Sequence, residues 1–355
     1  MGRLFSIEEG TLKARTWVAI GVLALAAFMI TAATGSAAPK ATFTASLISD
    51  VGKFNDKSFN QDQLAGLKLA QKQLGVSILP IQSNSSSDYL PNLTTAVRRG
   101  AQIVMAAGYL LAPTLSQIAP QFPKVDFTIT DDSVKGPDFA KAKSVANVMG
   151  LTFASNEAGC LVGYLAGEMV TKQGGKQVIG AVGGIKIPSV DDYIVGYKYC
   201  AKLADPKITV VTGYSQDFVA QDKCKTVAQN QIGQGSQVEF QVAGGCGLGV
   251  LSAADQAGIW GIGVDVDQYA LAKNVLTSAV KRVDVGIFDA VKLAKTGQFK
   301  GGTDLVFDLK NKGVSVGKVS PKVPKAFITK MNAIKAKIIA GTLKVPYAPG
   351  SPAVG

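Results

Sequence analysis

Downstream of residue 40, short runs of apolar and β-branched residues alternate with longer stretches in which apolar residues recur every three or four positions. The short runs are typical of buried strands, and the longer spacing is typical of amphipathic helices. Strands are predicted at 42–49, 76–82, 102–107 and 125–130, with helices between them at 58–74, 87–99 and 111–119. Alternation of this kind builds a parallel sheet with helices on both faces.

A second series of the same kind begins near Val148. Strands are predicted at 177–183, 207–214, 238–243 and 259–264, and helices at 155–172, 188–203, 220–233 and 248–257. The remaining tail breaks the alternation, with strands at 275–281, 304–309 and 314–318 and helices at 283–296 and 322–340. The pattern therefore predicts two successive α/β lobes followed by a tail of mixed elements.

The N-terminal 37 residues have the layout of a secretory signal. Arg3, Lys13 and Arg15 precede an apolar run at 17–33, and small residues follow at 35–38. Cleavage is expected after Ala37, and an uncleaved membrane anchor is the alternative because the run is near the lower length for spanning a bilayer. Export from the cytoplasm is expected in either case.

Composition favours binding over catalysis. The chain has 355 residues, of which 47% are hydrophobic and 17% charged, enough to form two ordinary cores. The net charge of +12 comes from scattered lysines and arginines without a dense run, so nucleic-acid binding is not indicated. The absence of histidine excludes Ser-His-Asp and Cys-His catalysis and His-ligated metals, and neither a metal nor a cofactor is expected.

The four cysteines lie far apart, which argues against a zinc or thioredoxin-like site. An even number in an exported protein fits two disulfides, for which three pairings are possible. We favour Cys160–Cys200 with Cys224–Cys246, because Cys224 falls early in a predicted helix and Cys246 just after a strand, which places both near one edge of a cleft. Free buried thiols are the alternative.

The residues from Asp50 to Asn60 connect the first strand to the first helix and are the first candidate ligand site. Ser58 followed by Gln61 is a capping-box pattern, which predicts that the helix begins at Phe59. Phe59 and Asn60 then lie at the carboxyl end of a strand, where open α/β sheets bind ligands. An aromatic ring and an amide suit a flat, polar small molecule; the alternative is a capped helix anchored by a core phenylalanine.

A glycine-rich turn at 244–249 follows a predicted strand and includes Gly245. It lacks the G-x-G-x-x-G spacing of a dinucleotide site. Asp265 lies twenty residues after Gly245, at the end of the next strand, which is where dinucleotide folds bind ribose hydroxyls. The alternative role for Asp265 is capping the helix that follows.

Several stretches resemble the basic membrane protein family, substrate-binding proteins of ABC transporters that include purine-nucleoside receptors. They are DVGKFNDKSFNQ (50–61), LVGYLAG (161–167), VGGIKIPSVDDYIVGY (182–197), QVAGGCGLGV (241–250), GIGVDVDQ (261–268), TSAVKRVD (277–284) and IIAGTLKVP (338–346). The resemblance implies a type I periplasmic-binding-protein fold, with two doubly wound parallel-sheet lobes joined by a three-strand hinge. Lobe 1 is then expected at 41–148 plus 280–302, and lobe 2 at 149–279 plus 303–355.

The resemblance also implies roles for individual residues. Phe59 and Phe218 are expected to stack on a nucleobase, and Asn60 and Asp131 to contact the base edge, Asp131 being favoured over the neighbouring Asp132 by its family position. Asp265 and Lys281 are expected to pair with each other and to hold a sugar. Gly245 and, less strongly, Asp50 and Asp132 are further candidates.

Three departures from the family pattern concern the ligand and the anchor. Ala220 stands where an acidic residue is usual, Cys246 stands where threonine is common, and no lipobox cysteine follows the apolar run. The first two put ligand identity in question, and the third puts lipid anchoring in question.

The resulting interpretation is an exported, non-enzymatic binding protein that encloses a nucleoside, with purines favoured, and delivers it to an ABC permease in the cell membrane. It is expected to be a monomer outside the cytoplasm that does not bind nucleic acid. The alternatives are a sugar or polyol binding protein, a sensor subunit with the same fold, and a nucleoside hydrolase or NAD-dependent enzyme.

Overall fold

The structure, a computed structural model, describes residues 42–351. The predicted signal segment and its cleavage position lie outside the described residues. Among the residues that are described, no helix is both long enough and apolar enough to cross a membrane.

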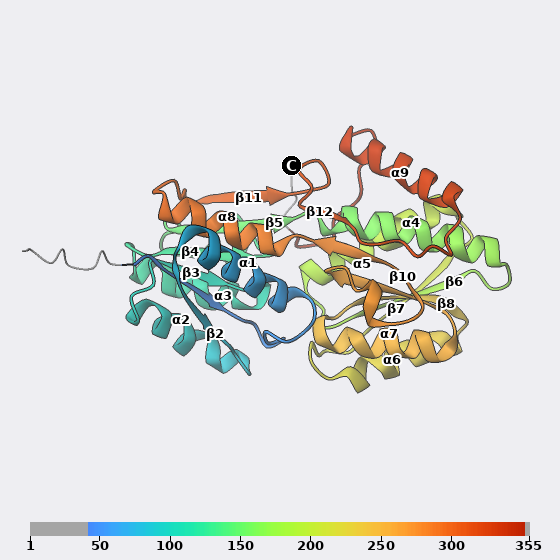
Figure 1. Cartoon of the computed structure of the whole chain (residues 1–355), viewed down its shortest axis with the longest axis horizontal. Coiled ribbons are helices and arrows are strands. Elements are labelled where there is room, and N and C mark those ends of the chain that lie inside the picture. Colours follow the sequence, from blue (N-terminus) through green and yellow to red (C-terminus); the bar gives the residue numbers. More distant parts are fainter. Residues whose placement is uncertain (1–41, 352–355) are drawn as a thin grey trace, which may run out of the picture. The chain divides into compact units, whose positions relative to one another are not determined.

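The first of two six-stranded sheets is entirely parallel (Figure 1). Its order is β11-β5-β4-β3-β1-β2, formed by β1 (Thr44–Ile48), β2 (Ser77–Ile81), β3 (Ile103–Ala106), β4 (Asp126–Thr130), β5 (Val148–Phe153) and β11 (Thr303–Phe307). Its helices are α1 (Phe59–Leu74), α2 (Tyr89–Arg98), α3 (Ala112–Ile118) and α8 (Val283–Lys295), of which α8 packs along α1. We call this part of the molecule lobe 1.

The second sheet has the order β12-β10-β9-β8-β6-β7, and only β12 is antiparallel to its neighbour. Its strands are β6 (Val178–Gly183), β7 (Thr209–Tyr214), β8 (Ser236–Val242), β9 (Trp260–Asp265), β10 (Val275–Lys281) and β12 (Val314–Val316). The helices are α4 (Ser155–Gln173), α5 (Pro188–Ala204), α6 (Gln221–Gly233), α7 (Leu248–Ala257) and α9 (Lys325–Ile339). We call this part lobe 2, and the predicted α/β architecture is confirmed.

The lobe boundaries differ from the expected ones. Residues 149–153 and 303–307 are expected in lobe 2 from the sequence, but β5 and β11 pair with each other and extend the first sheet. The chain leaves that sheet only after Phe153, because β5 pairs with β4 as far as Leu151 and with β11 as far as Phe153. We therefore propose lobe 1 as 42–153 plus 283–307 and lobe 2 as 155–281 plus 314–351.

Helices α4 and α5 pack against each other more extensively than any other pair of helices in lobe 2. A Cβ atom added to Gly163 would lie 2.2 Å from the backbone oxygen of Tyr197, so only glycine permits this approach. The disulfide between Cys160 and Cys200 joins the same two helices at a Cα–Cα distance of 4.8 Å. The second disulfide joins Cys224 to Cys246, so both pairs match the pairing favoured from sequence.

The interior of lobe 2 contains one isolated acid. Glu239 on β8 is fully buried, and neither of its carboxyl oxygens has a hydrogen-bond partner among the described residues. It lies over Gly180, where an added Cβ atom would come within 2.4 Å of both oxygens. Burial raises the pKa of Glu239 to about 8, so its side chain is neutral at neutral pH.

We predict that Glu239→Gln stabilises the protein at alkaline pH. The unfolded carboxyl ionises near its ordinary pKa of 4.5, whereas the folded one ionises near 8, so the free energy of unfolding falls as pH rises between these values. The amide cannot ionise, so the variant should gain on the order of a few kcal/mol at pH 9 relative to the native chain. Urea unfolding from pH 5 to 9 measures this.

The exposed Asp222, changed to Asn, provides the matched control and should leave the pH profile unaltered. A Glu239→Gln profile parallel to that of the unaltered chain would show that this carboxyl is not held neutral.

Candidate functional site

A pocket with about 500 Å³ of atom-free space, including its open mouth, lies between the lobes. Its walls come largely from the carboxyl ends of strands and the turns that follow them, which is where parallel sheets bind ligands. The lining residues are Asp50, Gly52, Asp56, Phe59, Asn60, Gly108, Tyr109, Asp131, Ile187, Ser189, Val190, Tyr193, Phe218, Val242, Ala243, Gly244, Val264, Asp265 and Lys281.

Lys281, the last residue of β10, is a buried cation that connects the lobes. Its Nζ lies 2.7 Å from Oδ2 of Asp131 in lobe 1 and 3.8 Å from Oδ1 of Asp265 in lobe 2. Only 3% of its side chain is exposed, so these charges interact with little solvent screening. Asp265 is the partner expected for Lys281 from the sequence, but the closer partner is Asp131, the residue expected to contact the base edge.

Both of these acids have a left-handed backbone. Asp131 follows β4 with φ of 65°, and Asp265 ends β9 with φ of 64°. Aspartate tolerates this conformation better than most residues, at a cost of about 1–2 kcal/mol. Each turn redirects the chain at the end of a central strand, and both carboxylates consequently reach the same lysine.

The carboxylate of Asp265 also contacts lobe 1. Its Oδ2 accepts a 2.6 Å hydrogen bond from the Ser58 hydroxyl, and its Oδ1 accepts one of 3.3 Å from the Tyr193 hydroxyl. Burial raises the pKa of Asp265, and the neighbouring Lys281 opposes this shift. Because Ser58 is used in this way, its side chain does not cap α1, contrary to the capping-box prediction.

Asp56 provides the cap instead. Its Oδ1 accepts hydrogen bonds from the backbone N–H groups of Ser58 and Gln61, both at 3.0 Å, and its Oδ2 accepts one of 2.8 Å from the N–H of Asn60. The Asn60 side chain donates to Asp50 Oδ1 at 2.7 Å and to Asp56 Oδ2 at 3.2 Å. Asn60 lines the pocket, but its amide group mainly holds two acids in place.

Asp50 projects from the end of β1 and is almost fully buried. Its Oδ1 accepts hydrogen bonds from the backbone of Gly52 and the side chain of Asn60, whereas no described residue donates to Oδ2. Burial raises the pKa of Asp50 to about 7 despite these hydrogen bonds. Asp50 is therefore an acceptor whose charge changes near neutral pH.

Phe59 begins α1 and contributes an aromatic wall. The edge of its ring is so close to Gly108 that an added Cβ atom there would lie 3.1 Å from Cε1. The ammonium of Lys281 lies 4.7 Å from the ring centroid, close enough for a cation–π attraction. Phe59 thus borders the pocket and also stabilises the buried cation.

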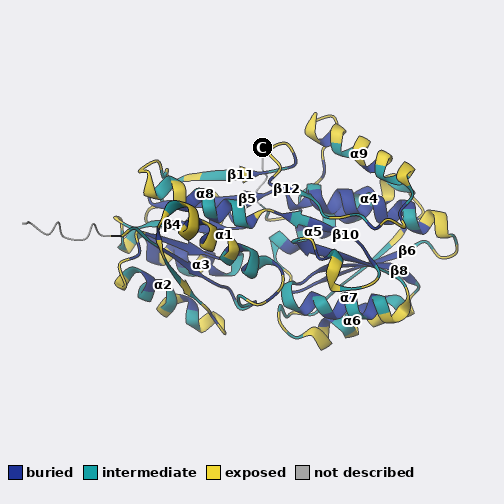
Figure 2. Cartoon of the chain, viewed as in Figure 1, coloured by how far each residue is buried: buried dark blue, intermediate teal, exposed yellow. Residues whose placement is uncertain are grey.

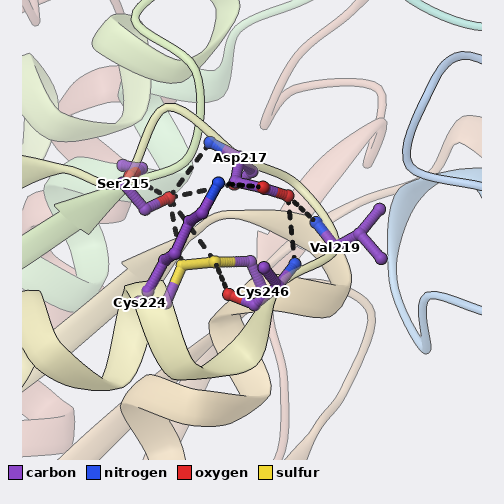
Figure 3. Close-up of polar contacts among 8 residues, drawn as sticks. Ser215, Asp217, Val219, Cys224 and Cys246 are labelled. Atoms are coloured by element: carbon purple, nitrogen blue, oxygen red, sulfur yellow. Dashed lines mark hydrogen bonds and ion pairs between the residues drawn. A yellow bond between two sulfur atoms is a disulfide. The ribbon is translucent and has the colours of Figure 1, made fainter. Parts of the chain in front are cut away.

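Phe218 lies between Asp217 and Val219 in a turn of lobe 2, and Figure 3 shows the polar contacts of these two neighbours. The carboxylate of Asp217 accepts hydrogen bonds from the backbone of Val219 and Ala220 at 2.8 and 3.0 Å. The backbone oxygen of Phe218 accepts from the N–H of Cys246 at 3.0 Å, and Cys246 is fixed by its disulfide to α6. The disulfide therefore anchors the turn that presents Phe218.

The structure brings together most of the residues predicted from sequence. Asp50, Phe59, Asn60, Asp131, Phe218, Asp265 and Lys281 all line the pocket. Gly245 does not line it, because its neighbour Gly244 occupies that wall. Asp132 is also absent from the lining, and its Oδ1 instead accepts from the backbone N–H of Ser133.

Sequence reasoning missed three polar contributors: Asp56, Ser58 and Tyr193. Asp56 and Ser58 were part of the first candidate stretch, but a local pattern does not show which of them caps the helix. Tyr193 lies on α5 and is recognisable only by its position in the block 182–197.

The charges of the lining restrict the ligand. Among the residues that the structure describes, four carboxyl groups line the pocket, from Asp50, Asp56, Asp131 and Asp265, and Lys281 is the only lining cation. Phosphate or carboxylate groups would be repelled in this buried setting. A neutral ligand with several O–H and N–H donors fits, because a carboxylate accepts hydrogen bonds at both oxygens.

The family model described as "ABC transporter substrate-binding protein PnrA-like", Bmp, matches residues 43–348. The chain belongs to the Bmp family. This is a family of substrate-binding proteins of ABC transporters rather than of enzymes. The resemblance seen in the sequence blocks is thereby confirmed, and several relatives are named basic membrane proteins.

Two Bmp relatives show how far the similarity extends. The CD4+ T-cell-stimulating antigen of Listeria monocytogenes is 33% identical, over 86% of this chain and 89% of that protein. The ABC transporter nucleoside-binding protein BmpA of Lactococcus lactis is 32% identical, over 93% of this chain and 98% of that protein. Both cover the two lobes.

A solved structure agrees with the fold. The solute-binding protein of an ABC transporter system from Aeropyrum pernix has a TM-score of 0.77 to this chain, at 23% identity, covering 86% of this chain and 94% of that one. This likeness concerns the fold alone.

We predict that Lys281→Met destabilises this Bmp protein by roughly 3–5 kcal/mol, because it leaves two buried carboxylates without a cation. Urea unfolding at pH 7 measures the change. Adding Asp131→Asn to the same chain should recover part of the loss, since one of the unpaired charges is then removed. If the double variant were no more stable than Lys281→Met alone, the loss would not be electrostatic.

Proposed function

We propose that this protein binds a nucleoside between its lobes. The observation that carries the proposal is that two phenylalanines from different lobes and a hydroxyl-accepting carboxylate line one pocket: Phe59, Phe218 and Asp265. A nucleoside combines a flat aromatic base with a ribose that has several hydroxyl donors. The base can stack on the two phenylalanines, and the ribose hydroxyls can donate to the carboxylate. The Lactococcus relative is named a nucleoside-binding protein, which supports the same ligand class.

In this proposal the ribose lies against Asp265 and Lys281. The oxygens of Asp265 already accept from Ser58 and Tyr193, but each carboxylate oxygen can accept a second hydrogen bond. The ammonium of Lys281 can donate to a ribose oxygen while it stays paired with Asp131. The ribose hydroxyls would therefore supply hydrogen-bond donors to a pocket whose side chains offer more hydrogen-bond acceptors than donors.

The base lies between the aromatic walls, and stacking contributes roughly 1–3 kcal/mol per aromatic partner. Asp50 is the acceptor for a base N–H group, because its Oδ2 has no donor among the described residues. Asn60 supports Asp50 rather than binding the base directly. These roles revise the sequence-based assignment, in which Asn60 and Asp131 contacted the base edge.

The wider setting follows from the family. The protein would work outside the cytoplasm, associated with the membrane, and would deliver its nucleoside to an ABC permease as a monomer. A sensor subunit that presents the ligand to a receptor would use the same pocket. An NAD-dependent activity is disfavoured, because the carboxylates of the lining repel a pyrophosphate.

We predict that Asp265→Asn weakens guanosine binding by about tenfold or more, because hydrogen bonds to a charged group contribute roughly 1.5–3 kcal/mol each. Isothermal titration calorimetry measures the dissociation constant. Asp267→Asn is the matched control, since Asp267 is exposed, two residues away and outside the pocket.

Comparison of ligands tests the proposal itself. Guanosine and adenosine should bind far more tightly than ribose, because only the base uses the aromatic walls, and guanosine monophosphate should bind weakly. Ribose binding as tight as guanosine binding would identify a sugar-binding protein instead. Release of free guanine during prolonged incubation would indicate a nucleoside hydrolase.

We also predict that guanosine affinity rises with pH between 6 and 8. The pKa of Asp50 is raised to about 7, and a base N–H prefers the ionised carboxylate, so protonation below pH 7 should weaken binding. Titrations at half-unit pH intervals test this, and Asp50→Asn should flatten the profile. A profile that stays steep in this variant would assign the titration to another group.

A further inference from the structure

Positive charge is very unevenly distributed along the chain. Residues 309–355 contain nine lysines and no aspartate, glutamate or arginine. Residues 42–308 contain 24 basic and 23 acidic residues, so the larger part of the described molecule is almost neutral. Most of the net charge of +12 therefore comes from the last 47 residues. The lysines are spaced apart, and no dense run reveals them in the sequence.

The fold places most of this segment on the outside of lobe 2. Helix α9 packs against α4, and its outer side is exposed (Figures 1 and 2). Met331 and Ile338 are the buried residues of α9. The nine lysines are Lys310, Lys312, Lys318, Lys322, Lys325, Lys330, Lys335, Lys337 and Lys344, and all are exposed except Lys335, which is half-buried.

Few of these lysines are neutralised within the described residues. Lys330 pairs with Glu168 at 2.9 Å, and Lys318 and Lys322 lie over the rings of Tyr269 and Trp260. Four others on or beside α9 have neither an acidic partner nor an aromatic one in the part of the chain that the structure describes. These four, Lys325, Lys335, Lys337 and Lys344, are called the unpaired lysines below.

The exposed side of α9 is also smooth. At 100° per residue, Lys325 lies at one edge of that side and Lys337 at the other. The exposed residues of α9 between them are small and uncharged: Ala326, Thr329, Ala333 and Ala336. Lysines on both margins of such a surface can contact a flat partner at the same time, because no large side chain separates them from it.

We propose that α9 and the residues after it dock on an anionic membrane surface. Charge complementarity selects the partner, since lysines without internal partners are attracted to acidic lipid headgroups when they come within a Debye length of them. A substrate-binding protein of an ABC transporter acts next to a membrane, so this surface is available to it. Docking through α9 would restrict how the protein is oriented at the bilayer while leaving the ligand pocket unchanged.

The test compares two variants of the full chain that have lost the same charge. The first changes the unpaired lysines to Gln. The second changes Lys68, Lys72, Lys124 and Lys141 to Gln; these are exposed lysines of lobe 1 without an ion pair among the described residues. Both keep residues 1–41, so any contribution of the N-terminal segment is the same in each.

Binding is measured by co-sedimentation with vesicles of phosphatidylglycerol and phosphatidylcholine, and with phosphatidylcholine vesicles alone. The unaltered chain should prefer the anionic vesicles, and the preference should fall with added salt. Loss of the unpaired lysines should reduce it by roughly tenfold or more, and loss of the lobe 1 lysines by less than about threefold. Circular dichroism checks that both variants are folded.

A second readout locates the contact. Amine labelling of the vesicle-bound chain, followed by peptide mass spectrometry, should show the unpaired lysines protected on anionic vesicles and Lys68 and Lys124 still labelled. Equal losses in the two variants, or equal labelling of both lysine sets, would overturn the proposal. No preference of the unaltered chain for anionic vesicles would also overturn it and would favour an acidic protein surface as the partner of α9.

Discussion

The site depends on one buried ammonium group. Lys281 is almost completely enclosed and lies between Asp131 of lobe 1 and Asp265 of lobe 2. A buried charge is stable only when it is paired, so the lysine favours an arrangement in which both lobes supply a carboxylate. The hydrogen bond from Ser58 to Asp265 adds a second polar contact between the lobes. These contacts join the two lobes through residues that also line the pocket or bond to its lining.

Backbone geometry places these charges. Asp131 and Asp265 occupy equivalent positions, each at the carboxyl end of a strand in its own sheet and each with a left-handed backbone. Strained backbone of this kind persists where the surrounding structure enforces it, and it is concentrated at functional sites. Each lobe thus contributes one aspartate at a left-handed turn that follows a strand, and Lys281 from β10 pairs with both aspartates.

The segments that carry the two aromatic residues of the pocket, Phe59 and Phe218, are each fixed by contacts with neighbouring residues. Asp56 caps α1 and fixes the position of Phe59 at its first turn. The disulfide between Cys224 and Cys246 secures the turn that carries Phe218, and Asp217 closes that turn from the other side (Figure 3). The aromatic walls are therefore held by a covalent bond and by hydrogen bonds to charged groups, whereas Lys281 with Asp131 and Ser58 with Asp265 join the lobes through noncovalent contacts.

The amino-acid sequence by itself determined the order of strands and helices, the two-lobed α/β class, the start of α1 at Phe59 and a set of pocket residues that included Asp265 and Lys281. The element order, the helix start and Asp265 follow from periodicity and from the rule that ligands bind at strand ends, both of which are local, whereas the role of Lys281 came from the family resemblance. Only the tertiary structure decided that β5 and β11 complete the first sheet, that Asp131 is the nearer partner of Lys281, and that Ser58 bonds to Asp265 instead of capping its helix. The partners in the two hydrogen bonds, Ser58 with Asp265 and Lys281 with Asp131, lie 150 or more positions apart in the sequence. Several carboxylates could accept from each donor, so the packing of the lobes decides which one does.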